Sequence, residues 1–463
     1  MGFKTKRQKR NPAILDNGVP LLWGAPNEFS YDYDAGAPND DPNDIRLQFY
    51  RGLMEGEYTE SGEVVIDSSG DAQYTRMGSG AAVGMGRFIV SGRGQISTSA
   101  TDVKGRVRVY YIPTNNRDIS GNSTTLIMKN EIVSTESYSG FGQNVAIFGR
   151  KMVVTESGSF YTTPVKPAKA WLFNNYDEDS YGDKILLKEF SAAMDTTNLA
   201  GKLYVRTGQD RILLTAPDPV GNDNSAYLYR NDGTLIKNIT RNSGLVGDWL
   251  GVNGGAIGCG RIVIGQPGTT GSGGRINIYD LNGNLIKVVT DPATQTNTYY
   301  GMSVAVGGGY IFASAPYHDG LADTWLSGSA DQSVIYKYDL DGNFIEKFNG
   351  LGRGSYDGKD LVGGIPASPR FGYDGMIASG GRLFIVGRTA TTQNSNMSIL
   401  TLDGDNVGFK NLNEDYCSIQ DASNGWVMIG KDRANLDKGE VSAYFAGEHL
   451  TPWDVMDYNK GRR

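Results

Sequence analysis

The sequence contains few residues of the types that usually carry covalent or metal chemistry. Two histidines, His318 and His449, are too few for a multi-histidine metal centre. Two cysteines, Cys259 and Cys417, lie far apart and match no zinc or redox spacing, so we expect both to be free thiols. His318 lies in a predicted loop, where its ring could form a hydrogen bond with a ligand. The residue types alone therefore exclude many enzyme classes.

Motifs for nucleotide binding and nucleophilic catalysis are also missing. No complete GxGxxG, GxxxxGK[ST] or GxSxG pattern occurs among the 63 glycines. Ser303, between Met302 and Val304, is predicted to be a small residue facing the core. Glycosidase chemistry would need paired carboxylates, and loop residues could supply them, but acidic loop residues are usually turn formers. These loop residues are Asp319, Asp323, Asp331 and Asp357. We therefore predict no catalytic residues, no metal, no cofactor and a protein that is not an enzyme.

Charge is concentrated at the two ends of the chain. The whole sequence has 44 Lys and Arg against 51 Asp and Glu, for a net charge of −7. Residues 1–11 are predicted to form a basic arm that contacts an acidic neighbour, and residues 457–463 a basic tail. The acidic body between them should repel nucleic acid and anionic membranes, and we expect neither a signal peptide nor membrane insertion. The cations of the arm are Lys4, Lys6, Arg7, Lys9 and Arg10.

A repeated pattern of short strands predicts the fold. In its clearest copy, residues 300–306 and 310–316 are apolar runs that meet at a glycine turn. Residues 333–340 and 343–348 then flank a predicted two-residue turn, because Asp-Gly between apolar runs is a strong hairpin signal. Such pairs recur at Asp232-Gly233, Asn282-Gly283, Asp341-Gly342 and Asp403-Gly404. The unit is thus four short antiparallel strands.

Eight copies of this unit follow one another along the chain. Their second strands start near residues 20, 87, 151, 211, 261, 310, 382 and 425. Units of this size bury both faces only when they stack around a common axis, so we predict an all-β protein, a β-propeller of four-stranded antiparallel blades. Eight blades are favoured, in one domain spanning residues 12–456. Seven is the alternative, because the first inner strand (13–15) and the last outer strand (449–454) are weak.

Three copies of the repeat begin with an aromatic residue followed by glycine: Phe141-Gly142, Tyr300-Gly301 and Phe371-Gly372. With the strands ending near Gly-Ala-Pro or Ser-Ala-Pro, they resemble the FG-GAP repeats of integrin-α-type propellers. That family often has an acidic calcium loop between its inner strands, but here residues 258–260 and 307–309 are glycine-rich, so the resemblance implies no calcium. In general style the chain also resembles virion structural proteins of tailed bacteriophages.

One face of the predicted propeller carries long aromatic loops. The connections between second and third strands, and between blades, open on the face opposite the tight hairpins. Exposed Tyr and Trp there suit protein contacts or stacking on sugar rings. The predicted binding residues are Tyr31, Tyr33, Tyr317, His318, Trp325 and Tyr356.

Together these features predict an interaction protein of a phage virion or tail. It would act in a multi-copy assembly, contacting other virion proteins or a glycan or protein of the host surface. A glycan-binding lectin and a carbohydrate-active enzyme are the alternatives.

Overall fold

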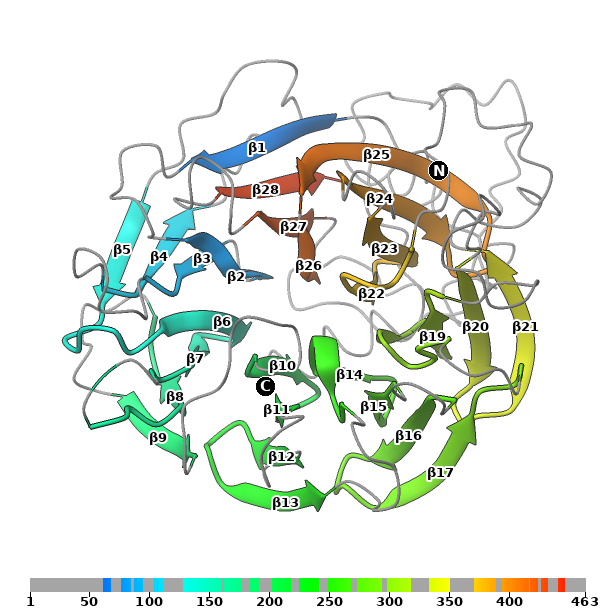
Figure 1. Ribbon diagram of the computed structural model, residues 1–463, viewed down its shortest axis with the longest axis horizontal. Coiled ribbons are helices and arrows are strands. Elements are labelled where there is room, and N and C mark those ends of the chain that lie inside the picture. Colours follow the sequence, from blue (N-terminus) through cyan, green and yellow to red (C-terminus); the bar gives the residue numbers. More distant parts are fainter. Residues whose placement is uncertain are drawn as a thin grey trace, which may run out of the picture.

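The strands of the protein form a ring of seven four-stranded antiparallel sheets (Figure 1). This arrangement, a β-propeller, is seen in the computed structural model for the residues that it describes. Described are residues 61–67, 76–84, 87–94, 104–111, 128–159, 162, 164–176, 184–190, 202–217, 225–240, 249–267, 273–293, 298–317, 333–349, 370–388, 394–415, 417–423, 426–431 and 440–445.

Six blades take their strands in chain order, from the axis outward. The first three are β2 (Met77–Gly84), β3 (Arg87–Gly92), β4 (Arg106–Tyr111) and β5 (Met128–Val133); β6 (Phe141–Phe148), β7 (Lys151–Glu156), β8 (Lys169–Phe173) and β9 (Lys184–Glu189); and β10 (Tyr204–Gly208), β11 (Arg211–Ala216), β12 (Ser225–Arg230) and β13 (Leu235–Thr240). The next three are β14 (Ala256–Gly258), β15 (Arg261–Gln266), β16 (Arg275–Asp280) and β17 (Leu285–Thr290); β18 (Val304–Gly307), β19 (Tyr310–Ala315), β20 (Val334–Asp339) and β21 (Phe344–Asn349); and β22 (Met376–Ser379), β23 (Arg382–Arg388), β24 (Asn394–Thr401) and β25 (Asn406–Asp415).

The seventh blade joins the two ends of the described chain. Its inner strands are β26 (Ser418–Ser423), β27 (Trp426–Lys431) and β28 (Glu440–Phe445). Its outermost strand is β1 (Ser61–Asp67), which pairs antiparallel with β28 so that Val64 lies opposite Ala443. Figure 1 shows β1 beside β28, where the blue and red ends of the chain meet. The ring is therefore closed by hydrogen bonds between distant segments.

The prediction of eight blades is wrong. Seven of the eight predicted second strands are present, and the copy at residues 20–26 lies outside the described residues. The predicted outer strand at residues 449–454 also lies outside them, and β1 occupies the outer position of that blade. Strand patterns report local alternation of apolar residues, whereas the blade count depends on which strand completes the ring.

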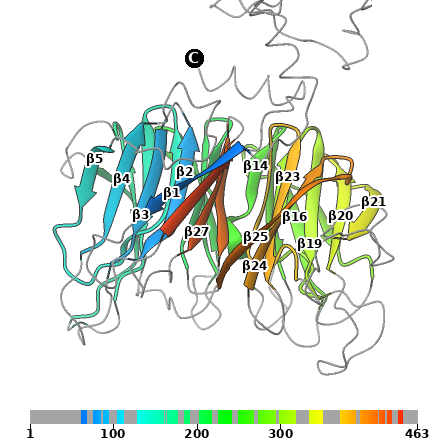
Figure 2. The same ribbon diagram turned by 90° about the horizontal axis from the view of Figure 1, so that it is seen from above.

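The core lies between blades. Buried apolar residues form seven clusters, and each joins side chains from two adjacent sheets. At the closing blade, for example, Phe88 of β3 meets Trp426 of β27 edge to face, with ring centroids 5.1 Å apart. Figure 2 shows the sheets stacked around the axis of a disc. Each blade buries both of its faces only because it has a neighbour on each side.

At the joint between the blades of β14 and β18, glycines allow the two backbones to touch. Gly301, three residues before the start of β18, has φ +84°, and a Cβ there would stand 2.5 Å from the carbonyl oxygen of Arg275 in the neighbouring blade. A Cβ at Gly265 of β15 would in turn collide with the carbonyl oxygen of Gly301. These two repeat positions are therefore small because the backbones of adjacent blades touch there.

The Asp-Gly and Asn-Gly pairs all lie in hairpins between third and fourth strands, as predicted, but the turns are longer. In the hairpin after β20, Asp339 N donates to Asn343 O at 3.0 Å and Gly342 N donates to Asp339 O at 3.0 Å. Gly342 has φ +75°, while Asp341 is absent from the residues with positive φ. Each connection is therefore a three-residue loop, a type I turn followed by a left-handed glycine and a bulge, and not the predicted two-residue turn.

Candidate functional site

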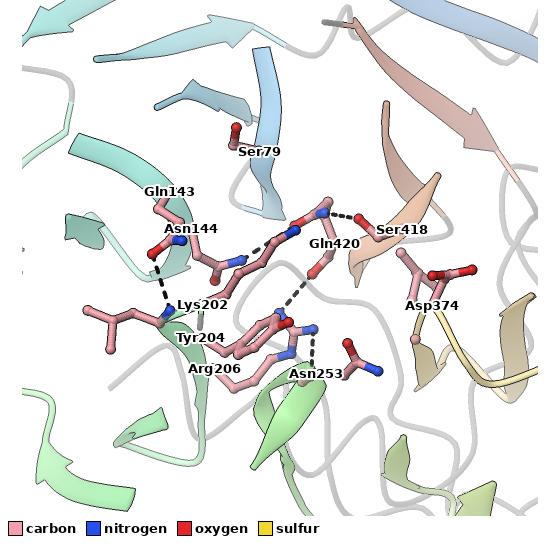
Figure 3. Close-up of a pocket in the computed structure, with 13 residues that line it drawn as sticks. Ser79, Gln143, Asn144, Lys202, Tyr204, Arg206, Asn253, Asp374, Ser418 and Gln420 are labelled. Carbon is pink, nitrogen blue, oxygen red and sulfur yellow. Dashed lines mark hydrogen bonds between the residues drawn. The ribbon is translucent and has the colours of Figure 1, made fainter. Parts of the chain in front are cut away.

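A small hollow opens where the innermost strands begin, at the axis of the ring. The centre of a water molecule can occupy about 30 Å³ there, room for roughly two waters. The strands β2, β6, β10 and β26 and the segments before β14 and β22 supply its walls. Its lining residues are Ser79, Gln143, Asn144, Lys202, Leu203, Tyr204, Arg206, Asn253, Asp374, Gly375, Ser418, Ile419 and Gln420 (Figure 3).

Side-chain amides tie the innermost strands together around the hollow. Asn144 of β6 donates from Nδ2 to Oε1 of Gln420 at 3.4 Å and accepts a hydrogen bond from the backbone N–H of Val205 at 3.2 Å. Gln143 Oε1 accepts from the N–H of Leu203 at 3.2 Å. Three blades are thereby held at fixed positions around the axis, so the polar groups of the hollow are preorganised.

Arg206 of β10 contributes a guanidinium group to the wall of this hollow. Its Nη1 donates to the carbonyl oxygen of Gln420 at 3.0 Å and its Nη2 to that of Asn253 at 3.4 Å (Figure 3). Burial lowers the pKa of Arg206, and the charge of Asp421 opposes that shift. Within the described chain no carboxylate forms an ion pair with the guanidinium; the Asp421 oxygens accept the N–H groups of Val83 and Ala422.

Asp374, two residues before the start of β22, places a buried carboxyl group on the wall of the same hollow. It is 5% exposed, and its Oδ2 lies 3.5 Å from Nε of Arg388 but accepts no hydrogen bond from the part of the chain that the structure describes. Burial raises the pKa of Asp374 to about 6, while Arg388, Lys202 and Arg370 act in the opposite direction. A carboxyl group with such a pKa can exchange a proton near neutral pH.

A row of aromatic rings stacked with arginines lies next to Asp374. Ring centroids are 6.3 Å apart for Trp249 and Tyr299, 4.9 Å for Tyr299 and Tyr317, and 5.8 Å for Tyr317 and Tyr373. The guanidinium of Arg370 lies 4.6 Å from the Tyr317 ring, and that of Arg388 lies 4.6 Å from the Tyr373 ring. We call Trp249, Tyr299, Tyr317, Tyr373, Arg370 and Arg388 the tyrosine–arginine cluster.

The repeat places this cluster on the face that carries the connections between blades and those between second and third strands. We call this the long-loop face. Trp249, Tyr299 and Arg370 each stand two residues before the left-handed glycine that precedes an inner strand. Tyr317 follows β19, at the start of a connection between second and third strands. In an antiparallel blade both kinds of connection lie on the same face. Equivalent positions of three successive blades therefore build one surface.

The structure describes only one of the predicted binding residues. Tyr317 is half-buried, its pKa is raised chiefly by burial, and its backbone N–H donates to Thr298 O at 3.2 Å. Outside the described residues lie Tyr31, Tyr33, His318, Trp325 and Tyr356, the four loop aspartates, and the arm residues Lys4, Lys6, Arg7, Lys9 and Arg10.

The other residues singled out from the sequence are structural. Cys259 and Cys417 form no disulfide, as predicted, and both side chains are buried. Ser303 is also buried as predicted, and its hydroxyl accepts a hydrogen bond from Asn253 Nδ2 at 3.1 Å. Asn253 Nδ2 also donates to the carbonyl oxygens of Met302 and Tyr373, which fixes the segment before β14 to the next two blades.

Among the described residues, no group of three His, Cys, Asp or Glu side chains is placed to hold a metal ion. No helix in that part of the chain is long and apolar enough to cross a membrane.

Comparisons with known proteins show the fold alone. No protein-family model matches the chain, and no curated protein matches it either. Among solved structures, it is similar to the β-propeller domain of the Trilobed protease from Pyrococcus furiosus, with 10% identity over 86% of this chain and 98% of that one and a TM-score of 0.43. It is also similar to an α-L-arabinofuranosidase from Fusarium graminearum, with 10% identity, 84% and 97% coverage and a TM-score of 0.39. A xyloglucanase from Xanthomonas campestris has 12% identity, 82% and 61% coverage and a TM-score of 0.42.

The prediction that the chain is not an enzyme needs correction. It was based on missing sequence motifs, whereas the similar solved structures include a domain of a protease and two glycosidases. Likenesses this distant show no activity for this chain. Function must therefore be argued from the residues of its own long-loop face and axis.

Proposed function

We propose that the protein is an interaction propeller that binds its partner with the long-loop face. The FG-GAP resemblance and the phage style of the sequence lead us to propose a virion or tail component of a phage. There it would mediate assembly with other virion proteins or attachment to the host surface. The basic arm would be an auxiliary contact to an acidic neighbour.

The tyrosine–arginine cluster carries this proposal. Tyr, Trp and Arg are the residue types that dominate binding energy at protein interfaces, because they combine large contact areas with few rotatable bonds or with several hydrogen-bond donors. Here they come from three successive blades and lie in ring contact with one another. Each arginine rests on a tyrosine ring, which holds its guanidinium in place.

Imaging purified virions with a labelled antibody against this protein tests the proposed location in the virion. The label should decorate purified virions at one repeated position, and particles that never bind it would contradict the proposal.

Tyr317→Ala tests the face. We expect this change to weaken incorporation or partner binding by about 30-fold, the effect of losing about 2 kcal/mol at an interface anchor. Tyr111→Ala is the matched control, because Tyr111 also lies under an arginine, Arg87, 4.1 Å away, but at the opposite end of its blade. Equal losses of incorporation or partner binding in the two variants would rule out the long-loop face as the binding surface.

A carbohydrate-active enzyme is the second candidate, and Asp374 favours it. Its raised pKa, to about 6, suits a general acid, although glycoside hydrolysis also needs a second carboxylate at the bond. Release of reducing ends from polysaccharides, abolished by Asp374→Asn, would support this candidate. Saccharide-array binding without release would favour a lectin.

A further inference from the structure

Two hydrogen-bond donors face the axial hollow without an acceptor. Gln143 is 3% exposed, and its Nε2 has no hydrogen-bond partner among the described residues although its Oε1 accepts from Leu203 N. Arg206 has five N–H groups. Its contacts to the carbonyl oxygens of Gln420, Asn253 and Val205 leave two of them without an acceptor in the described chain. The Gln143 donor is buried, and a buried donor of this kind calls for an acceptor group.

The charges around the hollow point to a negative ligand. Lys202 lies close enough to Asp374 to lower its pKa, so a second cation stands near Arg206 on the wall. The Asp374 carboxyl faces Arg388 at 3.5 Å, and the Asp421 oxygens are bonded to backbone N–H groups. Neither carboxylate therefore makes a direct ion pair with Arg206. A small oxyanion would meet both cations and the Gln143 amide.

The size of the hollow limits what can enter. Room for roughly two waters matches the two oxygen atoms of a carboxylate better than a whole sugar ring. Arginine also recognises planar carboxylates through parallel hydrogen bonds. We propose that the axial hollow binds the carboxylate group of a ligand, held by Arg206, Gln143 and Lys202 (Figure 3). The carboxylate belongs to a free small acid or to a uronic acid whose ring stays outside. The proposal does not depend on the partner of the long-loop face.

Titration calorimetry on the full-length protein tests this site with four probes. Acetate and glucuronate should bind saturably with one site per chain, whereas methyl glucoside, which lacks the charge, should not. Acetate alone would indicate a free small acid, and tighter glucuronate binding would indicate that a sugar ring contributes at the mouth; each result supports the carboxylate site. No saturable binding of either acid, or sulfate binding as tightly as acetate, would overturn it.

Two variants and a control locate the binding. Arg206→Gln should weaken acetate or glucuronate binding at least ten-fold. Gln143→Glu keeps the acceptor for Leu203 N but replaces the donor with a charge, and should abolish binding even if Arg206→Gln fails to fold. Arg211→Gln is the matched control, because Arg211 follows the β10 turn at the other end of the strand and donates to Leu281 O at 2.6 Å. Unchanged binding in Gln143→Glu, or an equal loss in Arg211→Gln, would reject the site.

Discussion

Asp374 makes the stability of the fold depend on pH near 6. Its pKa is about 6 in the folded protein against an ordinary value of 3.8, so the folded state binds the proton more tightly than the unfolded chain does. The associated stabilisation is complete below pH 4 and is lost as the pH rises from about 4 to 6. The difference corresponds to about 3 kcal/mol at most. Burial also raises the pKa of Asp421 and Glu156, which adds to the same trend.

Replacing this carboxyl group should flatten the pH profile. We expect the free energy of unfolding of the natural protein to fall between pH 4.5 and 6.5, and that of Asp374→Asn to fall much less. Urea denaturation at the two pH values measures both slopes. Asp339→Asn serves as control, because hydrogen bonds from Asn343 and Asp341 lower the pKa of Asp339 and shift its effect below pH 4. If the free energy of unfolding fell equally with pH in the natural protein and in Asp374→Asn, the pH dependence would not come from Asp374.

At the scale of elements, the joints between blades depend on backbone contact. Gly265→Ala should destabilise the protein by more than about 3 kcal/mol, because its Cβ collides with the carbonyl oxygen of Gly301 and the strands must separate. Gly260→Ala is the control: Gly260 has φ +77° but an added Cβ meets nothing within 4 Å, so only backbone strain of about 1 to 2 kcal/mol remains. The denaturant midpoints of the two variants measure these losses. A larger loss in Gly260→Ala than in Gly265→Ala would show that adjacent blades can separate at little cost.

The sequence predicted the second and third strands of the blades well, for a physical reason. In β15 and β16, for example, apolar and β-branched residues recur in short runs bounded by glycine, which indicates buried strands without reference to distant residues. The turn type was missed because Asp-Gly is compatible with both a two-residue and a three-residue loop, and only the bulge in the partner strand distinguishes them.

The candidate site was less predictable, because it is built from separate linkers. Tyr317 was identified from its loop, but Trp249, Tyr299 and Tyr373 lie in three different connections and meet only when the blades are placed in order. Trp249 and Tyr299 both stand two residues before a left-handed glycine, which was a usable signal, whereas Tyr373 follows its glycine. Nothing local distinguishes Arg206 or Gln143 from other polar residues of inner strands, since their shared hollow exists only in the closed ring.

At the scale of the whole molecule, the ring should depend strongly on β1. Ile66 is 5% exposed and packs in the apolar cluster between the closing blade and the blade of β2. Ile66→Ala should therefore lower the free energy of unfolding by about 2 to 5 kcal/mol. Ile185 provides the matched control on another outermost strand, because it is 42% exposed and its replacement should cost less than about 1 kcal/mol. Thermal unfolding curves should separate the two variants clearly, and similar midpoints would mean that β1 contributes little to closure.

The pairing of β1 with β28 also sets the order of events during protein synthesis. The strand of residues 61–67 leaves the ribosome early, but its partner at residues 440–445 follows only after roughly 20 to 75 s at typical translation rates. During that interval β1 has no strand to pair with, and the blade of β2 has one uncovered face. The ring can close only when nearly the whole chain has been made, so a chain released early keeps an open edge available to other strands.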